Sequence, residues 1–210
     1  MEPKERIRAK AHEIFLRYGI RSISMDEIAT QLGVSKKTIY QFFADKDALV
    51  DDIIADEIKY MEYDCLQCGL RARDAVDEIM ITMVQVLEQF SNMNPIVIHD
   101  LQKYHNASYQ RIVRHKSDFL LNIISNNIER GIQEGLYRPE INVEIMSRFH
   151  VESMMIAFNI ELYTPKKFNL VEVTRELIEH YVFGLATPKG YEQIRTYRSE
   201  LNNKMNKNEN

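Results

Sequence analysis

The sequence has few of the residues that interrupt helices or cross-link chains. Of its 210 residues, seven are Gly, five are Pro and two are Cys, and Trp is absent. Two cysteines are too few for a disulfide framework, so a reducing, cytoplasmic setting is expected. No apolar run approaches the roughly 18 residues needed to cross a bilayer, and the N-terminus lacks the apolar core of a signal peptide. We therefore expect a cytoplasmic protein with no membrane partner.

The residues that are present favour helices. Apolar residues make up 45% of the chain and charged residues 28%, with many Leu, Ile, Glu, Lys and Met. Apolar positions recur at helical spacing, and no strand pattern is found. The sequence predicts an all-α fold, with two short helices and the start of a longer one between residues 24 and 61. Further helices are expected at about 3–18, 74–92, 95–104, 107–134, 142–163 and 170–186, followed by a frayed polar tail.

Charge is distributed unevenly along the chain. Residues 1–46 contain nine Lys/Arg and six Asp/Glu, a net charge of +3, which leaves 18 and 25, a net charge of −7, for the remainder. The total of −4 alone argues against a nucleic-acid ligand. A basic segment on an acidic remainder is nevertheless typical of a phosphate-binding module joined to a separate body.

Residues 25–43, MDEIATQLGVSKKTIYQFF, have the pattern of a helix-turn-helix. Ser24 and Glu27 form a capping box ahead of the first helix. Ala29 is small enough for two helices to cross closely, and Gly33 supplies the positive φ of the tight turn. The second helix begins after Ser35 and would place its outward residues in a major groove. These outward residues are Lys36, Lys37, Thr38 and Gln41.

With its flanks, this segment resembles the DNA-binding head of the TetR (tetracycline-repressor-like) family of bacterial transcriptional regulators. The resemblance covers about residues 5–54 and departs mildly at Ile23, where the family often has Thr. The rest of the chain is similar only in architecture and in the segment GLYRPEI. The positions that agree are Gly19, Ser24, Ile28, Ala29, Leu32, Gly33, Val34, Ser35, Ile39, Tyr40, Phe42, Phe43, Lys46 and Leu49. We expect a helix-turn-helix head at 1–46, a helical ligand-binding and dimerisation body at 47–200 and a polar tail at 201–210.

The resemblance implies contacts with a double-stranded DNA operator. Ser24, Tyr40 and Lys46 would bind phosphates and fix the register without reading sequence. Helix N-termini at Ser24 and Ser35 would add backbone N–H donors, and Phe42 would touch a sugar or pack. The candidates for base contacts are Lys36, Lys37, Thr38 and Gln41.

A single head covers about one half-site, so a homodimer on a palindromic operator is expected. The last two long helices are the natural interface, as the resemblance also implies. Residues 151–162, VESMMIAFNIEL, are apolar nearly all round, as expected of a helix buried on two sides. The interface candidates are Met155, Leu170, Val173, Leu177, Tyr181 and Leu185.

The middle segments are rich in Met and aromatic residues, most of which are expected simply to pack. The resemblance implies a small-molecule inducer among these helices, in a largely apolar pocket with a few polar groups. The candidates are Met61, Met83, Phe90, His99, Gln102, Tyr104, Phe119, Asn122, Phe149, His150, Met154, Phe158 and Asn159. The identity of the inducer stays open, as does repression or activation, although the resemblance favours repression.

Three alternatives remain. Cys65 and Cys68 share a helix face and suggest a redox switch or half a metal site, but a second ligand pair is absent. His99-Asp100 is similar to part of a phosphohydrolase metal motif, yet no complete catalytic motif is present. We therefore predict no enzyme activity, metal or cofactor. A purely architectural DNA binder without a ligand is the third alternative.

Overall fold

The computed structural model describes residues 2–208, with side chains through Leu201. This part of the chain is built from helices and turns, with one isolated β-bridge between Tyr137 and Ala186. The predicted all-α fold is confirmed. None of its helices is long and apolar enough to span a bilayer.

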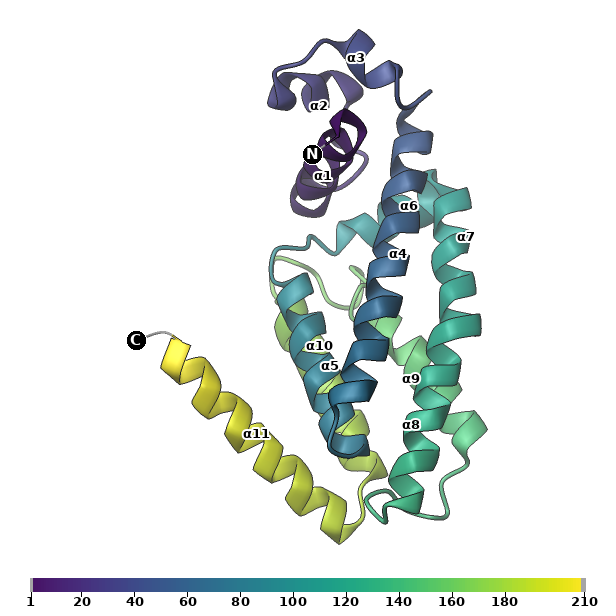
Figure 1. The fold of residues 1–210 in the computed structure, drawn as a ribbon, viewed down its shortest axis with the longest axis vertical. Coiled ribbons are helices and arrows are strands. Elements are labelled where there is room, and N and C mark those ends of the chain that lie inside the picture. Colours follow the sequence, from purple (N-terminus) through teal and green to yellow (C-terminus); the bar gives the residue numbers. More distant parts are fainter. Residues whose placement is uncertain (1, 209–210) are drawn as a thin grey trace.

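Three helices form a head at one end of the molecule (Figure 1). They are α1 (Pro3–Tyr18), α2 (Met25–Leu32) and α3 (Lys36–Tyr40). The long helix α4 (Lys46–Arg71) starts beside α3 and runs into the body. The apolar core of the head also includes Val97 and Leu101 from a body helix, so the interior of the head continues into the body.

The body is a bundle around the lower part of α4 (Figure 1). Within it, α5 packs against α10 and α8 packs against α9. A second core of buried apolar side chains, including Met80, Ile128 and Val182, lies among these helices. The helices are α5 (Ala75–Phe90), α6 (Ile96–Tyr104), α7 (Asn106–His115), α8 (Leu121–Gln133), α9 (Val143–Ile156) and α10 (Leu170–Leu185).

Two long helices differ from their expected ranges. The helix expected at 107–134 is divided into α7 and α8 by a π-helical turn at Lys116–Leu120. The helix expected at 142–163 ends at Ile156. Beyond it, the Asn159 side chain accepts hydrogen bonds from the N–H groups of Glu161 and Leu162, at 3.0 and 3.1 Å. This local hydrogen bonding offers the backbone an alternative to a continued helix.

The helix α11 (Pro188–Asn208) was not expected from the sequence. Its start has a recognisable signal, because Thr187 Oγ1 accepts the N–H of Gly190 at 3.1 Å and Pro188 occupies the first helical position. Residues 201–208, expected as a frayed tail, continue this helix, while 209 and 210 lie outside the described residues. The helix projects obliquely from the lower end of the body (Figure 1).

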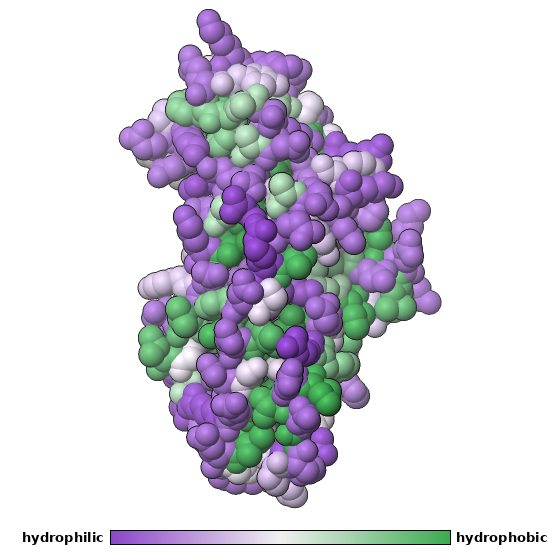
Figure 2. All heavy atoms as spheres, turned by 90° about the vertical axis from the view of Figure 1, so that its right-hand side faces the viewer, coloured by the Kyte–Doolittle hydropathy of each residue, from purple (hydrophilic) through white to green (hydrophobic). Residues whose placement is uncertain are grey.

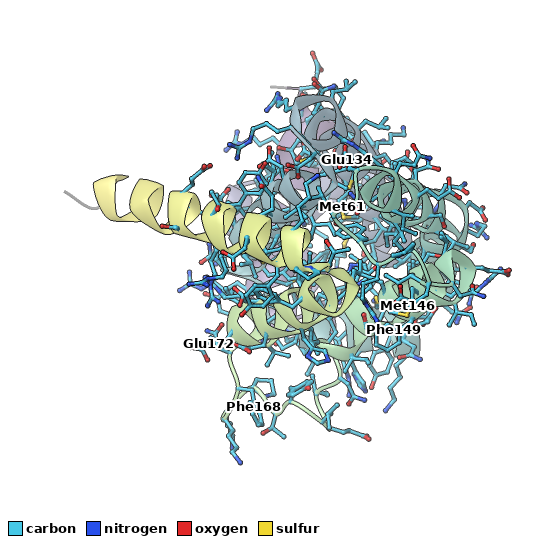
Figure 3. All side chains as sticks on the ribbon, turned by 90° about the horizontal axis from the view of Figure 1, so that it is seen from below. Met61, Glu134, Met146, Phe149, Phe168 and Glu172 are labelled. Carbon is cyan, nitrogen blue, oxygen red and sulfur yellow. The ribbon has the colours of Figure 1, made fainter. Side chains whose placement is uncertain are left out.

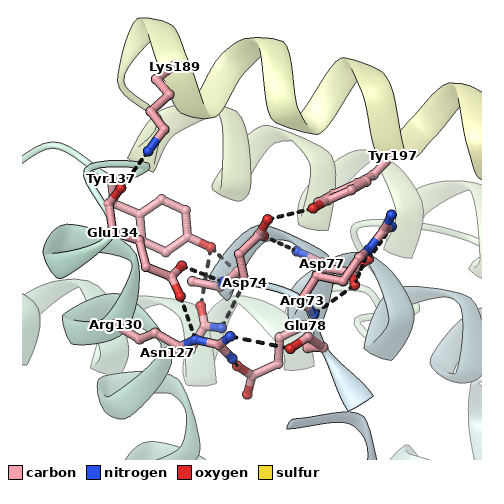
Figure 4. A network of polar contacts seen from close by, with 12 residues as sticks. Arg73, Asp74, Asp77, Glu78, Asn127, Arg130, Glu134, Tyr137, Lys189 and Tyr197 are labelled. Carbon is pink, nitrogen blue, oxygen red and sulfur yellow. Dashed lines mark hydrogen bonds and ion pairs between the residues drawn. The ribbon is translucent and has the colours of Figure 1, made fainter. Parts of the chain in front are cut away.

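Polar contacts tie α11 and α8 to the start of α5 (Figure 4). The Tyr197 hydroxyl donates to the carboxylate of Asp74 at 2.5 Å. Glu134 Oε2 accepts the N–H of Ala75 at 2.8 Å, and the buried Tyr137 hydroxyl donates to the carbonyl of Ala75 at 3.1 Å. The lower end of the body is therefore held by hydrogen bonds as well as by apolar packing.

Candidate DNA-binding surface and body cavity

The helix-turn-helix is stabilised by the caps expected from the sequence. Ser24 Oγ accepts the N–H of Glu27 at 3.2 Å, and the Glu27 carboxylate accepts the N–H of Ser24 at 2.5 Å. The backbone hydrogen bond from Ser24 lowers the pKa of Glu27. Gly33 has a φ of 66°, and the N–H of Val34 donates to the carbonyl of Ala29 at 3.0 Å. The turn between α2 and α3 is thus set by local hydrogen bonds.

Helix α3 presents its polar side chains outward. Ser35 caps it by accepting the N–H of Thr38 at 3.1 Å. Lys36 forms an ion pair with Asp26 of α2 at 2.9 Å, and Lys37 is exposed. Ser24, Gln41, Tyr40 and Phe42 are also exposed, whereas Phe43 is buried in the core of the head. The candidates from Ser24 to Phe42 therefore lie at one end of the molecule.

Lys46 is placed differently from the other DNA-binding candidates. Its ammonium donates to the carbonyl of Ile20 at 2.6 Å and lies over the ring of Phe15. Burial lowers the pKa of Lys46, although nearby carboxylates partly oppose this effect. Lys46 therefore links the start of α4 to the end of α1 instead of pointing outward.

A cavity of about 640 Å³ runs through the body. Helix α4 lines it from Val50 to Cys65, and α5, α9 and α10 form much of the remaining wall. Residues of the head, including His12, Phe15 and Leu16 of α1, line it as well. The predicted ligand residues that line it are Met61, Met83, Phe90, His150, Met154 and Phe158. Viewed from the end opposite the head, Met61 lies near the middle of the bundle (Figure 3).

The other predicted ligand residues lie outside this cavity. Helix α6 lines the cavity with Val97, Ile98 and Leu101, which were not candidates. The three candidates on α6 lie on other faces of that helix. Phe119 lines a separate shallow pocket, and Phe149 is exposed. The residues concerned are His99, Gln102, Tyr104, Phe119, Asn122, Phe149 and Asn159. Several have other local roles, such as Asn122, which donates to the carbonyl of Asp118 at 2.6 Å.

The candidates for the dimer interface are mostly used inside one chain. Tyr181 and Leu185 are buried in the core that α10 shares with α5 of the same chain, and Leu170 and Val173 are buried in a cluster with Ala157 and Phe158. Met155 and Leu177 line the cavity. The apolar stripe of α10 is therefore not available to a partner.

Helix α9 instead carries exposed apolar side chains. Ile145, Phe149 and Ile156 are 63%, 51% and 39% exposed. They are spaced by four and seven residues and so share one face of the helix. Phe149 lies on α9 beside Met146 in Figure 3. On the face seen in Figure 2, the most apolar side chains gather over the body, and the head above is mostly polar.

Comparisons with known proteins agree with the geometry of the head. A family model described as "Bacterial regulatory proteins, tetR family" matches residues 7–53. The chain is 30% identical over 185 residues to YvaF of Bacillus subtilis, an uncharacterized HTH-type transcriptional regulator, which covers 86% of this chain and 94% of YvaF. The chain belongs to the TetR family of bacterial regulatory proteins. It is a DNA-binding transcription regulator with a helix-turn-helix.

Two further relatives with known names extend the comparison. The HTH-type transcriptional repressor KstR2 of Rhodococcus jostii is 23% identical over 186 residues, which are 85% of this chain and 88% of KstR2. The crystal structure of FadR from Bacillus subtilis in complex with stearoyl-CoA has a TM-score of 0.65 at 17% identity. That match covers 86% of this chain and 98% of FadR. The TetR-family fold therefore extends into the body, over 86% of this chain.

The chemistry of the cysteines does not favour a redox switch in this TetR-family body. Both are free thiols. Burial raises the pKa of Cys65 to about 11 and also raises the pKa of Cys68, whose thiol donates to Gln85 Oε1 at 2.6 Å. A protonated thiol is a poor nucleophile and a poor metal ligand. Among residues 2–208, no group of three or more His, Cys, Asp or Glu side chains is arranged to hold a metal.

Sequence reasoning missed the part of the cavity wall that belongs to the head, and Thr174 on α10. Apolar periodicity predicts a helix at about 3–18 but does not say which surface the apolar side of a helix faces. On α10, Thr174, Ile178 and Tyr181 are spaced by four and three residues, so they share a face. A polar residue at Thr174 within that apolar stripe was the available signal.

Proposed function

We propose that the protein is a homodimeric repressor that recognises a palindromic operator with α3 and is released by a small, mostly apolar ligand bound in the body cavity. The observation that carries this proposal is that the cavity extends from the body into the head. Its wall includes Thr174 and Tyr181 of α10 at the body and His12 and Phe15 of α1 in the head. A ligand there contacts both the body and the helix on which α2 packs.

The proposed DNA-binding surface consists of α3 and the two helix N-termini around it. Ser24, Ser35 and Tyr40 would bind phosphates, and Phe42 would pack against a sugar. The side chains for base contacts are Lys36, Lys37, Thr38 and Gln41. Lys46 is not part of the proposed surface, because its ammonium donates to the carbonyl of Ile20. On this proposal residues 1–46 form the reading head and residues 47–200 the body that dimerises and binds the ligand.

A second copy of the chain is the proposed partner of the exposed face of α9. Ile145, Phe149 and Ile156 together expose an apolar stripe about three helical turns long. Two heads are needed to contact both halves of a palindromic site, and half-sites lie about one DNA turn apart. Dimerisation through α9 would bury the stripe and join the two bodies.

Named relatives support repression and ligand response. KstR2 is a repressor by name, and FadR of Bacillus subtilis was crystallised with stearoyl-CoA. In this chain, several hydrogen bonds and ion pairs connect the head and the start of α4 to the body. The N–H of Arg21 donates to Asp100 at 2.8 Å, the N–H of Asn94 donates to the carbonyl of Leu16 at 2.7 Å, and Arg111 pairs with Asp51 at 2.6 Å.

These contacts supply a mechanism by linkage. A ligand that favours a different spacing of α1 and α4 must weaken DNA binding. Because linkage is reciprocal, DNA must weaken ligand binding by the same factor. Typical coupling free energies are about 1–3 kcal/mol, which corresponds to roughly 5- to 150-fold in affinity.

The test is DNA binding by the purified protein. Labelled fragments that tile the DNA upstream of its own gene are titrated by fluorescence anisotropy, and the bound fragment is footprinted. We expect one palindromic footprint, two chains per site and about tenfold weaker binding in Gln41→Ala and Lys37→Ala. The matched control is Lys59→Ala, an exposed lysine on the body portion of α4. Equal binding to all fragments, or a single chain per site, would contradict the proposal.

A further inference from the structure

The wall of the cavity is largely apolar but contains buried polar atoms without a partner. Three such atoms belong to lining residues: His115 Nε2, Thr174 Oγ1 and Tyr181 Oη, considered among the side chains through Leu201. Leaving a buried polar group unpaired is unfavourable, and native proteins do so rarely. These atoms therefore indicate where a bound molecule would form hydrogen bonds.

Two of these atoms lie on one face of α10. Thr174 and Tyr181 are seven residues apart, which is about 10 Å along a helix. The ring of Tyr181 stacks on the imidazole of His150, with 3.7 Å between ring centroids and 5° between planes. This stacking fixes the direction of the Tyr181 hydroxyl. Burial raises the pKa of Tyr181 and lowers that of His150 to about 4, so both rings are neutral near pH 7.

The charges on the wall disfavour an anion. Four carboxylates line the cavity, and its lining lysine, Lys116, already pairs with Glu152 at 3.1 Å. These carboxylates are also poorly suited to bind a cationic ligand, because three of the four already have basic partners within 3.4 Å. The carboxylates are Asp56, Glu57, Asp64 and Glu78, of which Asp64 has no ion pair among the described residues.

We propose that the cavity binds an elongated, uncharged, largely apolar molecule whose hydroxyl or carbonyl oxygen is hydrogen-bonded by Tyr181, with Thr174 as a second polar contact. The elongated shape follows from α4, which lines the cavity from Val50 to Cys65, about 22 Å of helix. This inference rests on the proposed function of the cavity as the regulatory ligand site.

The first experiment compares three ten-carbon probes by isothermal titration calorimetry at pH 7.5 with the full chain. The probes are 1-decanol, decanoate and decylamine, which share a chain and differ in the charge of the polar end. We expect 1-decanol to bind at least tenfold more tightly than either ion, because an unpaired charge is costly to bury. An ion that binds as tightly as 1-decanol, or no binding by any of the three, would overturn the inference.

The second experiment tests the anchoring hydroxyl with Tyr181→Phe. We expect 1-decanol to bind roughly three- to tenfold more weakly, the effect of losing one neutral hydrogen bond. The melting temperature of the free variant should stay the same or rise, because the hydroxyl removed has no partner among the described side chains. A general structural defect would lower both the affinity and the melting temperature.

Tyr197→Phe is the matched control. Tyr197 is also buried, but its hydroxyl donates to Asp74 and it lies outside the cavity. Its loss should lower the melting temperature and leave the affinity for 1-decanol unchanged. Wild-type affinity in Tyr181→Phe would exclude Tyr181 as the anchor.

Operator binding separates this inference from the proposed function. If decanoate rather than 1-decanol releases the operator, the function stands and the ligand class is wrong. If the protein binds no specific DNA under any condition, the proposed function fails while the calorimetric comparison still decides which molecules enter the cavity.

Discussion

The head and the body differ in how their polar side chains are hydrogen-bonded and in how much empty space lies beside their buried side chains. In the head, Ile28, Ile39 and Leu49 are fully buried, and the hydroxyls of Ser24 and Ser35 accept the backbone N–H groups that start α2 and α3. In the body, a cavity of about 640 Å³ lies within the bundle, and hydroxyls on α10 have no partner among the described side chains.

This difference fits the roles proposed for the two regions. Satisfied caps and fully buried side chains specify one shape, which a surface that must match a DNA groove requires. Unfilled space and unpaired polar atoms cost stability and are kept where a second molecule can supply the missing contacts. The following predictions test whether the contrast is real and where it ends.

The largest effect is expected from core truncation. Leu49→Ala in the head removes a fully buried side chain that does not line the cavity and should lower the free energy of unfolding by about 3–4 kcal/mol. Met83→Ala should cost only about 1–2 kcal/mol, because Met83 already borders empty space and loses fewer contacts. Urea denaturation of both variants measures the difference. Equal losses would mean that the body is packed as tightly as the head.

The next largest effect is expected at the lower end of the body, where a substitution tests whether side chains are closely packed. A Cβ added at Gly131 of α8 would lie 2.0 Å from a ring carbon of Tyr137, which is fully buried. Gly131→Ala should therefore lower the free energy of unfolding by about 3 kcal/mol, as in overpacked cores.

Gly184→Ala is its control, because a Cβ at Gly184 meets nothing within 4 Å. That substitution should stabilise the protein by about 0.5–1 kcal/mol, since alanine favours the helix over glycine. If Gly131→Ala is as well tolerated as Gly184→Ala, the lower end of the body is as loose as the cavity.

The sequence allowed the head to be predicted in detail and the body only in outline. Local chemistry determines the caps at Ser24 and Ser35 and the positive φ at Gly33, so these follow from short segments. In contrast, Tyr181 is expected at an interface on a helix that faces both its own core and a partner, and in the structure it packs inside its own chain. An apolar stripe reports that a helix face is covered but not by which surface, which depends on contacts distant in sequence.

Lys46 and α11 show the same limit. Lys46 was expected at a phosphate on the resemblance, yet it donates to a carbonyl 26 residues earlier in the chain. Helix α11 has a local start signal at Thr187 and Pro188, but its burial against α5 depends on Ile194 and Tyr197 meeting a distant surface. Contacts of this range are not encoded in any short segment.

A smaller effect is expected from the titration of His150 on the cavity wall. Burial lowers its pKa to about 4 from 6.5 in the unfolded chain. The unfolded state therefore binds the proton more readily, and the stabilisation present above pH 6.5 is lost as the pH falls toward 4. Between pH 7 and pH 5 this group should cost about 2 kcal/mol of unfolding free energy.

His150→Phe keeps an aromatic ring against Tyr181 and removes the titration. Urea denaturation at pH 7 and pH 5 should show a loss smaller by about 2 kcal/mol in the variant than in the wild type. Other groups titrate in both proteins and cancel in the comparison. Identical losses would show that His150 is accessible to water and that the cavity wall is open at this point.

The smallest effect is expected in the salt dependence of DNA binding by the head. If Lys36 and Lys37 of each protomer, which lie in the groove on the proposed surface, each displace one counterion from the DNA, the slope of log K against log salt should be about −4 for a dimer. Lys37→Met should make that slope shallower by about 2. Lys46→Met should leave it unchanged, because the Lys46 ammonium is held by the carbonyl of Ile20. A slope that becomes shallower in Lys46→Met as well would mean that Lys46 leaves Ile20 and that the junction of α1 and α4 rearranges on DNA. The head would then be adaptable at the place where it meets the body.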